Sequence, residues 1–219
     1  MSDILKKPGI SLLLVGATGA VGSRVLQAAL ADPRIWHVVA PTRRPLPEQP
    51  GLEAPVVDFS ALPGDAHWWQ VDAVICALGT TIRTAGSQAA FAAIDRDLPI
   101  TVARLARAAG ATRCALNSSL GASARGNFYL RTKAEAEAGI GALGYPIYTI
   151  VRPSLIDTER AEPRTGERIG LALARALRPL IPRRYRAVSA ERIAHALIEG
   201  VLRDDPGQLI VESDEITTV

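Results

Sequence analysis

Short apolar runs alternate with segments of helical periodicity along most of the chain. The first run, residues 12–15, leads into a glycine-rich turn, and helical spacing follows as far as residue 30. Further strand-like runs occupy residues 36–41, 54–59, 71–78, 113–117, 145–151 and 208–212. Helical patterns occupy residues 87–109, 127–142 and 189–203, with Pro99 expected to kink or split the first of these. Strands that alternate with helices predict an α/β fold with one doubly wound parallel sheet.

The length of 219 residues fits a single domain spanning 1–219. Within it, we expect residues 155–205 to form a small C-terminal region on the substrate side. A hydrophobic content of 48% and a charged content of 21% are typical of a globular protein with a substantial core. The net charge of +3 is too small to argue for a nucleic-acid partner. No run approaches the roughly 20 apolar residues of a membrane span.

The N-terminus superficially resembles a signal peptide, because Lys6 and Lys7 precede the apolar residues 10–15. That run is short and continues directly into the glycine motif, so we expect no targeting segment and a cytoplasmic protein. The two cysteines, Cys76 and Cys114, both lie in strand-like runs. We therefore expect them to be buried free thiols in a reducing compartment.

The glycine motif has the spacing Gly16, Gly19, Gly22 between the first strand and the first helix. Glycines let the backbone approach a phosphate closely, and the N–H groups of a helix N-terminus attract anions. The motif predicts a site for the diphosphate of a dinucleotide, although an ordinary glycine-rich turn is the alternative. The expected contacts are Gly16, Thr18, Gly19, Ala20, Val21 and Gly22.

The second strand ends at Arg43 and Arg44, about 20 residues beyond the glycines, where such folds hold the adenosine ribose. An acidic side chain there would bind the free 2′-hydroxyl of NAD, whereas two guanidinium groups suit a 2′-phosphate. NADP(H) is therefore favoured over NAD(H), unless both arginines are solvated loop charges. Asp58, at the end of the third strand, can reach the adenine edge or cap its own loop.

The apolar run at residues 71–78 is typical of a central parallel strand, and Gly79, Thr80 and Thr81 follow it directly. Ligands of open α/β sheets bind beyond the carboxyl ends of the strands, so this turn should line the cofactor crevice. Asp95 and Asp97 lie within the next helical segment, where packing or surface pairing is the expected role and contact with the site is the alternative.

A catalytic pair is predicted at Tyr129 and Lys133, which project from one face of a helix because they are four residues apart. An ammonium beside a tyrosine favours its phenolate, and such a tyrosine can exchange a proton with a carbonyl or alcohol. Lys133 can also bind the nicotinamide ribose. Ser118 and Ser119, at the end of the 113–117 strand, are candidates to hold the substrate oxygen.

The use of lysine supports this interpretation, because the chain has 22 arginines and Lys133 is its only lysine beyond residue 7. A compact ammonium differs chemically from a guanidinium, so its retention at this position favours catalysis. A solvated helical pair is the alternative.

Taken together, these segments resemble the short-chain dehydrogenase/reductase superfamily, and within its atypical branch the Tat-interacting-protein-like NAD(P)-binding group. The resemblance is carried by GATGAVG at 16–22, VDF at 57–59, CALGTT at 76–81, DRD at 95–97, NSS at 117–119, Tyr129-x-x-x-Lys133 and RPS at 152–154. It implies an NADPH-binding Rossmann-like fold, with Arg43 on the 2′-phosphate and Gly79 and Thr80 beside the cofactor. Ser119, Tyr129 and Lys133 would then be the hydrogen bonder, the acid/base and the ribose-binding lysine. Further expected cofactor contacts are Phe59, Ala77, Leu78 and Pro153.

The function expected is that of an NADPH-dependent oxidoreductase acting on a small carbonyl or quinone-like substrate. The alternative is a catalytically weak NADPH-binding sensor that acts through a protein partner. The three histidines share no ligand spacing with the cysteines or acids, so no metal is expected. Between residues 160 and 186, eight arginines against two glutamates suit either an acidic substrate or partner, or a solvated surface.

Overall fold

The computed structural model describes residues 9–157 and 182–216, and a seven-stranded parallel sheet forms the centre of this part of the chain. The strand order is β3-β2-β1-β4-β5-β6-β9. These strands are β1 (Ile10–Val15), β2 (Ile35–Val39), β3 (Leu52–Glu53), β4 (Ala73–Cys76), β5 (Arg113–Asn117), β6 (Ile147–Arg152) and β9 (Gly207–Glu212). A separate pair joins β7 (Ile156–Asp157) to β8 (Val188–Ser189). The predicted doubly wound, Rossmann-like architecture is confirmed.

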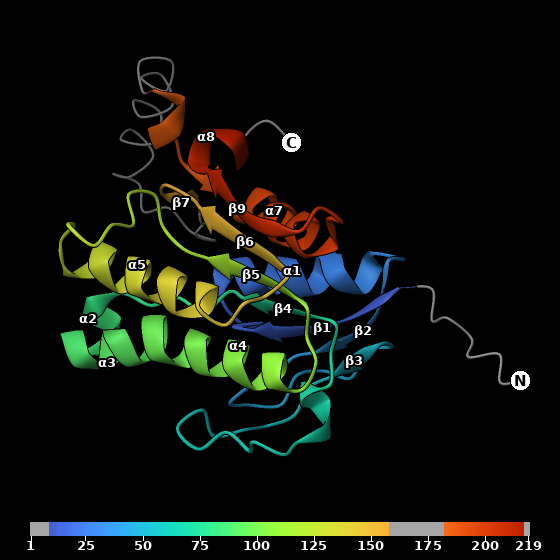
Figure 1. Ribbon diagram of the computed structural model, residues 1–219. Helices are drawn as coiled ribbons and strands as arrows, with labels where there is room; N and C mark the ends of the chain where they lie inside the picture. Colours follow the sequence, from blue (N-terminus) through green and yellow to red (C-terminus); the bar gives the residue numbers. More distant parts are fainter. Residues whose placement is uncertain (1–8, 158–181, 217–219) are drawn as a thin grey trace, which may run out of the picture.

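Helices cover both faces of the sheet (Figure 1). On one face α1 (Ala20–Ala31) packs against α7 (Ala190–Leu202), and on the other α4 (Leu98–Ala108) packs against α5 (Phe128–Gly141). The shorter elements are η1 (His67–Trp69), α2 (Ile82–Ala85), α3 (Gln88–Ala92), the π-helical η2 (Ala93–Asp97), η4 (Arg183–Tyr185) and α8 (Ser213–Ile216).

Two hydrophobic cores result from the alternation of side chains along the strands. In β1, Leu12 and Leu14 belong to the core beneath α1 and α7, whereas Leu13 and Val15 belong to the core beneath α4 and α5. All four are completely buried, and the burial of each side chain stabilises the folded state by about 1.5–3 kcal/mol. This two-sided burial explains why the central strands are continuous apolar runs in the sequence.

The turn between β1 and α1 requires glycine at two positions. Gly16 has a φ of +90°, and a Cβ at Gly22 would lie 1.9 Å from the carbonyl oxygen of Gly16. The Gly19 N–H donates to that same oxygen at 2.9 Å, which closes the turn directly before α1. The glycine spacing thus allows the helix to begin at the carboxyl edge of the sheet.

Two predicted elements differ from the observed ones. The third strand is Leu52–Glu53 rather than 54–59, where only an isolated bridge joins Thr42 to Val56. Pro55 lacks an N–H group, which limits strand pairing there. The predicted helix at 87–109 is divided into α3, η2 and α4, and Pro99 lies in the first turn of α4, where its missing N–H is tolerated.

The C-terminal part is described only in pieces. Residues 158–181, which include most of the arginine-rich segment, lie outside the described residues. Helix α7, which falls within the expected 155–205 region, packs into the core beside α1. Cys76 and Cys114 are buried and free, as predicted. No helix among the described residues is long and apolar enough to cross a membrane.

Candidate functional site

A cavity of about 520 Å³ opens at the carboxyl ends of β1, β4, β5 and β6. The strand arrows in Figure 1 point toward this edge of the sheet. The crossover between β1 and β4 lies here, which is where open α/β sheets bind their ligands. The lining residues are Gly19, Ala20, Val21, Ala77, Gly79, Thr80, Thr81, Thr84, Asp95, Asn117, Ser118, Ser119, Tyr129, Lys133, Pro153, Ser154, Leu155 and Ile156.

Most of the residues singled out in the sequence line this cavity, and some do not. Those that line it are Gly19, Ala20, Val21, Ala77, Gly79, Thr80, Ser118, Ser119, Tyr129, Lys133 and Pro153. Those outside its lining are Gly16, Thr18, Gly22, Arg43, Arg44, Asp58, Phe59 and Leu78. Thr81, in the turn expected at the crevice, also lines the cavity, as does Asp95, for which packing or surface pairing was the expected role and site contact the alternative. Asn117 was assigned no role from the sequence.

The N-terminus of α1 opens into the cavity without a protein cap. Its N-cap residue is Gly19, which has no side chain, and the first turn contains no acidic residue. Ala20 and Val21, the first two helical residues, line the cavity. The free N–H groups and the helix dipole make this end of the cavity attractive to an anion.

Lys133 is held by a buried ion pair. Its Nζ lies 2.7 Å from Asp95 Oδ1, and the two side chains are 6% and 0% exposed. The other carboxylate oxygen of Asp95 accepts a hydrogen bond from the Thr80 N–H at 3.1 Å. Asp95 therefore connects α5 to the turn that follows β4.

A signal for Asp95 was present in the sequence. It lies four residues after Phe91 and four before Pro99, and all three are buried. An acidic residue in the apolar stripe of a helix requires a buried partner. The pattern therefore favours a buried partner for Asp95 over surface pairing.

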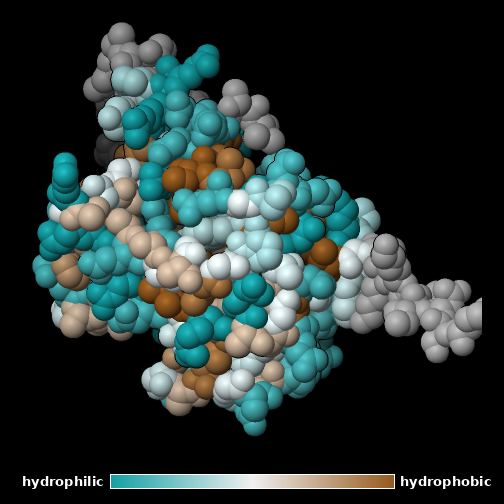
Figure 2. Space-filling view, viewed as in Figure 1, coloured by the Kyte–Doolittle hydropathy of each residue, from teal (hydrophilic) through white to brown (hydrophobic). Residues whose placement is uncertain are grey.

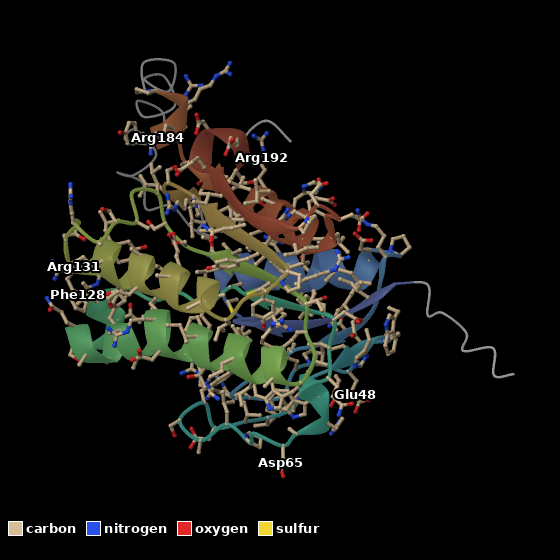
Figure 3. All side chains as sticks on the ribbon, in the orientation of Figure 1. Glu48, Asp65, Phe128, Arg131, Arg184 and Arg192 are labelled. Atoms are coloured by element: carbon tan, nitrogen blue, oxygen red, sulfur yellow. The ribbon has the colours of Figure 1, made fainter. Side chains whose placement is uncertain are left out.

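Tyr129 lies in the first turn of α5, directly after Phe128, the residue that begins this helix and is labelled in Figure 3. Its ring packs against that of Phe91, with centroids 5.4 Å apart. Asn127 caps the helix by accepting a hydrogen bond from the Leu130 N–H at 3.0 Å. These contacts fix the part of α5 that carries the tyrosine.

The other three tyrosines are placed differently. Tyr145 and Tyr148 are buried and donate to backbone carbonyls, and burial raises the pKa of each hydroxyl above its usual range. Tyr185 is 58% exposed and does not line the cavity. Of the four tyrosines, Tyr129 is the one among the lining residues of the cavity.

The two strand-end serines have different environments. Ser118 is buried, and its Oγ donates to Glu137 Oε1 at 2.5 Å. Glu137 is also held by Arg152, whose Nη2 lies 2.6 Å from Oε2, and these hydrogen bonds raise the pKa of the Arg152 guanidinium. Among the described residues, the Ser119 hydroxyl makes only a long hydrogen bond of 3.4 Å, from its Oγ to the carbonyl of Leu120. Ser119 therefore has the hydroxyl more available to a ligand.

Arg43 and Arg44 follow β2 and are exposed. Thr42 anchors the segment, because its Oγ1 donates to the Arg44 carbonyl at 2.8 Å and its N–H donates to Pro55 at 3.0 Å. Neither guanidinium forms an ion pair with any residue that the structure describes. Both charges are thus available at the carboxyl end of β2.

Asp58 caps its own loop by accepting hydrogen bonds at Oδ1 from the N–H and the hydroxyl of Ser60, at 2.8 and 2.7 Å. These hydrogen bonds lower the pKa of the Asp58 carboxyl. This geometry matches the loop-capping alternative. Phe59 packs against the core beneath α4 and α5.

The histidines do not gather at the cavity. His37 and His67 both lie beside Glu53, with Nε2 to carboxylate distances of 3.4 and 3.0 Å. Within residues 9–157 and 182–216, no cluster of three or more His, Cys, Asp or Glu side chains is arranged to hold a metal ion.

Comparison with known proteins identifies the family. Residues 16–204 match the model of the NAD(P)H-binding family. The protein HTATIP2 of Rattus norvegicus is 31% identical over 215 residues, which cover 95% of this chain and 88% of that protein. The protein fmp52, mitochondrial, of Emericella nidulans is 34% identical over 178 residues, 76% of either chain.

The expected cytoplasmic location is contradicted by these relatives. The similar Fmp52 proteins of Emericella nidulans and Candida albicans are mitochondrial by name. The prediction depended on the residues before the glycine motif and on free cysteines. Neither feature distinguishes the cytoplasm from another reducing compartment, because free cysteines persist in both.

Solved structures show the same fold. MoeE5 in complex with UDP-glucuronic acid and NAD superposes with a TM-score of 0.71 at 19% identity, covering 93% of this chain and 76% of that one. The Bordetella bronchiseptica enzyme WbmG in complex with NAD gives 0.67 at 16% identity, covering 97% and 75%. The chain thus belongs to the NAD(P)H-binding family, as an atypical, Tat-interacting-protein-like short-chain dehydrogenase/reductase.

Proposed function

We propose that this protein is an NADPH-dependent oxidoreductase that reduces a small carbonyl or quinone-like substrate, with Tyr129 as the proton donor. The observation that carries the proposal is one cavity that joins the uncapped N-terminus of α1 to Tyr129, Lys133 and Ser119. A redox cofactor and a proton donor must meet in such a space for the reaction to occur.

The residues present fit a phosphorylated dinucleotide. Because Gly19 has no side chain, a diphosphate can approach the backbone N–H groups at the start of α1. Gly19, Ala20 and Val21 would hold it there. Arg43 and Arg44, which pair with no acidic residue in the described part of the chain, supply positive charge where β2 ends, and this suits a 2′-phosphate. Gly79 and Thr80 would line the path between these two ends.

The chemistry divides between the cofactor and the protein. NADPH, when bound, supplies a hydride to the carbonyl carbon of the substrate. Tyr129 donates the proton of its Oη to the carbonyl oxygen, and Ser119 donates a hydrogen bond to that oxygen. Lys133 stabilises the resulting phenolate and binds the nicotinamide ribose, while Asp95 fixes the position of its ammonium.

A second candidate function is an NADPH-binding sensor with weak or no turnover. The ion pair of Lys133 with Asp95 favours it, because a carboxylate at 2.7 Å offsets much of the positive charge that would stabilise a phenolate. In this role Lys133 and Asp95 would be structural, and NADPH would act by ordering the loops around the cavity. The partner would be another protein.

A substitution at Tyr129 separates these functions. In an assay of NADPH oxidation against a panel of small aldehydes, ketones and quinones, Tyr129→Phe should lower the rate about 10²- to 10⁴-fold. Its affinity for NADPH should stay close to that of the wild type. Tyr185→Phe is the matched control, because this hydroxyl lies on an exposed side chain away from the cavity.

The outcomes are distinct. Turnover that depends on Tyr129 and not on Tyr185 supports the oxidoreductase. Turnover that Tyr129→Phe leaves unchanged contradicts the assigned proton donor. No turnover with any compound, together with NADPH-dependent protection from proteolysis, supports the sensor.

A further inference from the structure

Asn117 lies in the cavity wall, and its amide oxygen is buried without a hydrogen-bond partner among the described residues. Asn117 is the last residue of β5 and is 6% exposed. Its Oδ1 is fully buried and accepts no hydrogen bond within the described part of the chain. Its Nδ2 likewise donates to none of the described residues.

The other asparagine and the next residue in the chain do not share this property. Asn127, the other asparagine of the chain, accepts a hydrogen bond from the Leu130 N–H. Ser118, the next residue after Asn117, donates to Glu137. A buried carbonyl oxygen without a donor lowers the stability of the ligand-free protein, so its presence calls for a functional reason.

The position of Asn117 suggests what its partner is. Side chains alternate along a strand, and Ser118 faces Glu137 on α5, so Asn117 faces the opposite side of the sheet. Ala115, on that same side, packs in the core that contains α1. Asn117 and Val21 of α1 line one cavity together with Lys133. A ligand that runs from the α1 N-terminus to Lys133 therefore passes through a space that Asn117 also lines.

We propose that Asn117 recognises the carboxamide of the nicotinamide ring, with Oδ1 accepting from the carboxamide N–H and Nδ2 donating to its oxygen. This rests on the proposed function, which places the ring beside Tyr129 and Lys133. An amide offers one acceptor and two donors, so two amides form complementary pairs. Asn117 would then fix the orientation of the ring, which determines the face that transfers hydride.

The test compares two ligands that differ by the ring. NADPH contains nicotinamide, whereas 2′-phospho-ADP-ribose contains the same adenosine, diphosphate and ribose without it. In Asn117→Leu the dissociation constant of NADPH should rise about three- to tenfold, and that of 2′-phospho-ADP-ribose should stay unchanged. Asn117→Ala is the second variant, in case the larger side chain disturbs the cavity.

The melting temperature of the ligand-free protein provides an independent readout. Because Asn117→Leu removes an unsatisfied buried carbonyl, we expect it to maintain the melting temperature or raise it by about 2–4 °C. Asn127→Ala is the control, since it removes a helix cap and should lower the melting temperature.

Equal loss of affinity for both ligands would overturn the assignment, because it would place the role of Asn117 at the ribose or the diphosphate. Unchanged affinity of Asn117→Leu for NADPH would overturn it as well. If only the KM of the substrate rose, Asn117 would contact the substrate and not the nicotinamide ring. If the wild type binds neither ligand, the proposed function itself fails. The two failures are thus distinguishable.

Discussion

Lys133 Nζ lies 2.7 Å from Asp95 Oδ1, and this pair is almost completely shielded from water. Asp95→Asn should therefore destabilise the ligand-free protein by about 3 kcal/mol, because it leaves a buried ammonium without its counter-charge. Asp97→Asn is the matched control, since Asp97 is exposed, pairs with Arg96 and should cost less than about 1 kcal/mol. Urea denaturation measures both.

A double-mutant cycle tests the coupling directly. Asp95→Asn combined with Lys133→Met removes both charges, so its cost should be clearly smaller than the sum of the two single costs. Strictly additive costs would contradict the ion pair as the reason for burying these two residues.

The two strand-end serines should respond differently to truncation. Ser118→Ala should lower stability by about 1–3 kcal/mol, because Glu137 loses a buried hydrogen bond. Ser119→Ala should leave stability nearly unchanged and lower kcat by about 10²-fold with a carbonyl substrate. Denaturation and steady-state kinetics on both variants are the measurements. The reverse pattern would assign the substrate contact to Ser118.

Arg43→Ala should reduce the preference for NADPH over NADH. A charge-assisted hydrogen bond to a phosphate contributes about 1.5–3 kcal/mol, so the dissociation constant of NADPH should rise roughly 10- to 100-fold while that of NADH changes little. Arg125→Ala, in an exposed loop between β5 and α5, is the control. If Arg43→Ala keeps the preference of the wild type, the 2′-phosphate is held elsewhere.

The Asp32–Arg34 pair should make stability depend on pH. Hydrogen bonds from Arg34 lower the pKa of the Asp32 carboxyl, and Arg34 also reaches Glu199 on α7 at 2.6 Å. A lowered folded-state pKa means that the stabilisation is present above the unfolded pKa of about 3.9 and is lost as the pH falls through the folded value.

Asp32→Asn should therefore be less stable than the wild type by up to about 1 kcal/mol near neutral pH, with the difference vanishing in acid. Denaturation at a series of pH values measures this. In an Arg34→Ala background the pH dependence should be much weaker, and its persistence there would assign it to another group.

The order of the elements and the cavity edge could be predicted from the sequence, because burial on both faces leaves a continuous apolar run in each central strand. Residues 12–15 and 113–117 illustrate this, since every one of them but Arg113 is buried. The third strand was predicted at residues 54–59 but lies at Leu52–Glu53, because Pro55 has no N–H group to continue the pairing. The face of the molecule in Figure 2 is mainly hydrophilic, with scattered hydrophobic patches. Such a surface pattern does not predict which elements lie beneath it.

The candidate site was predicted where local spacing determines it and missed where distant segments meet. Tyr129 and Lys133 share a helix face by their spacing alone. Asp95 lies 38 positions before Lys133, so its partner is determined only when α5 packs beside η2. The choice between Ser118 and Ser119 likewise depends on Glu137, which no local pattern connects to them.

The central claim is that a phosphorylated pyridine dinucleotide binds across the carboxyl edge of the sheet, and calorimetric titration of the purified protein tests it most directly. We predict saturable binding of NADPH, with a lower dissociation constant than that of NADH. Absence of measurable heat and of any thermal stabilisation with either nucleotide would contradict the account.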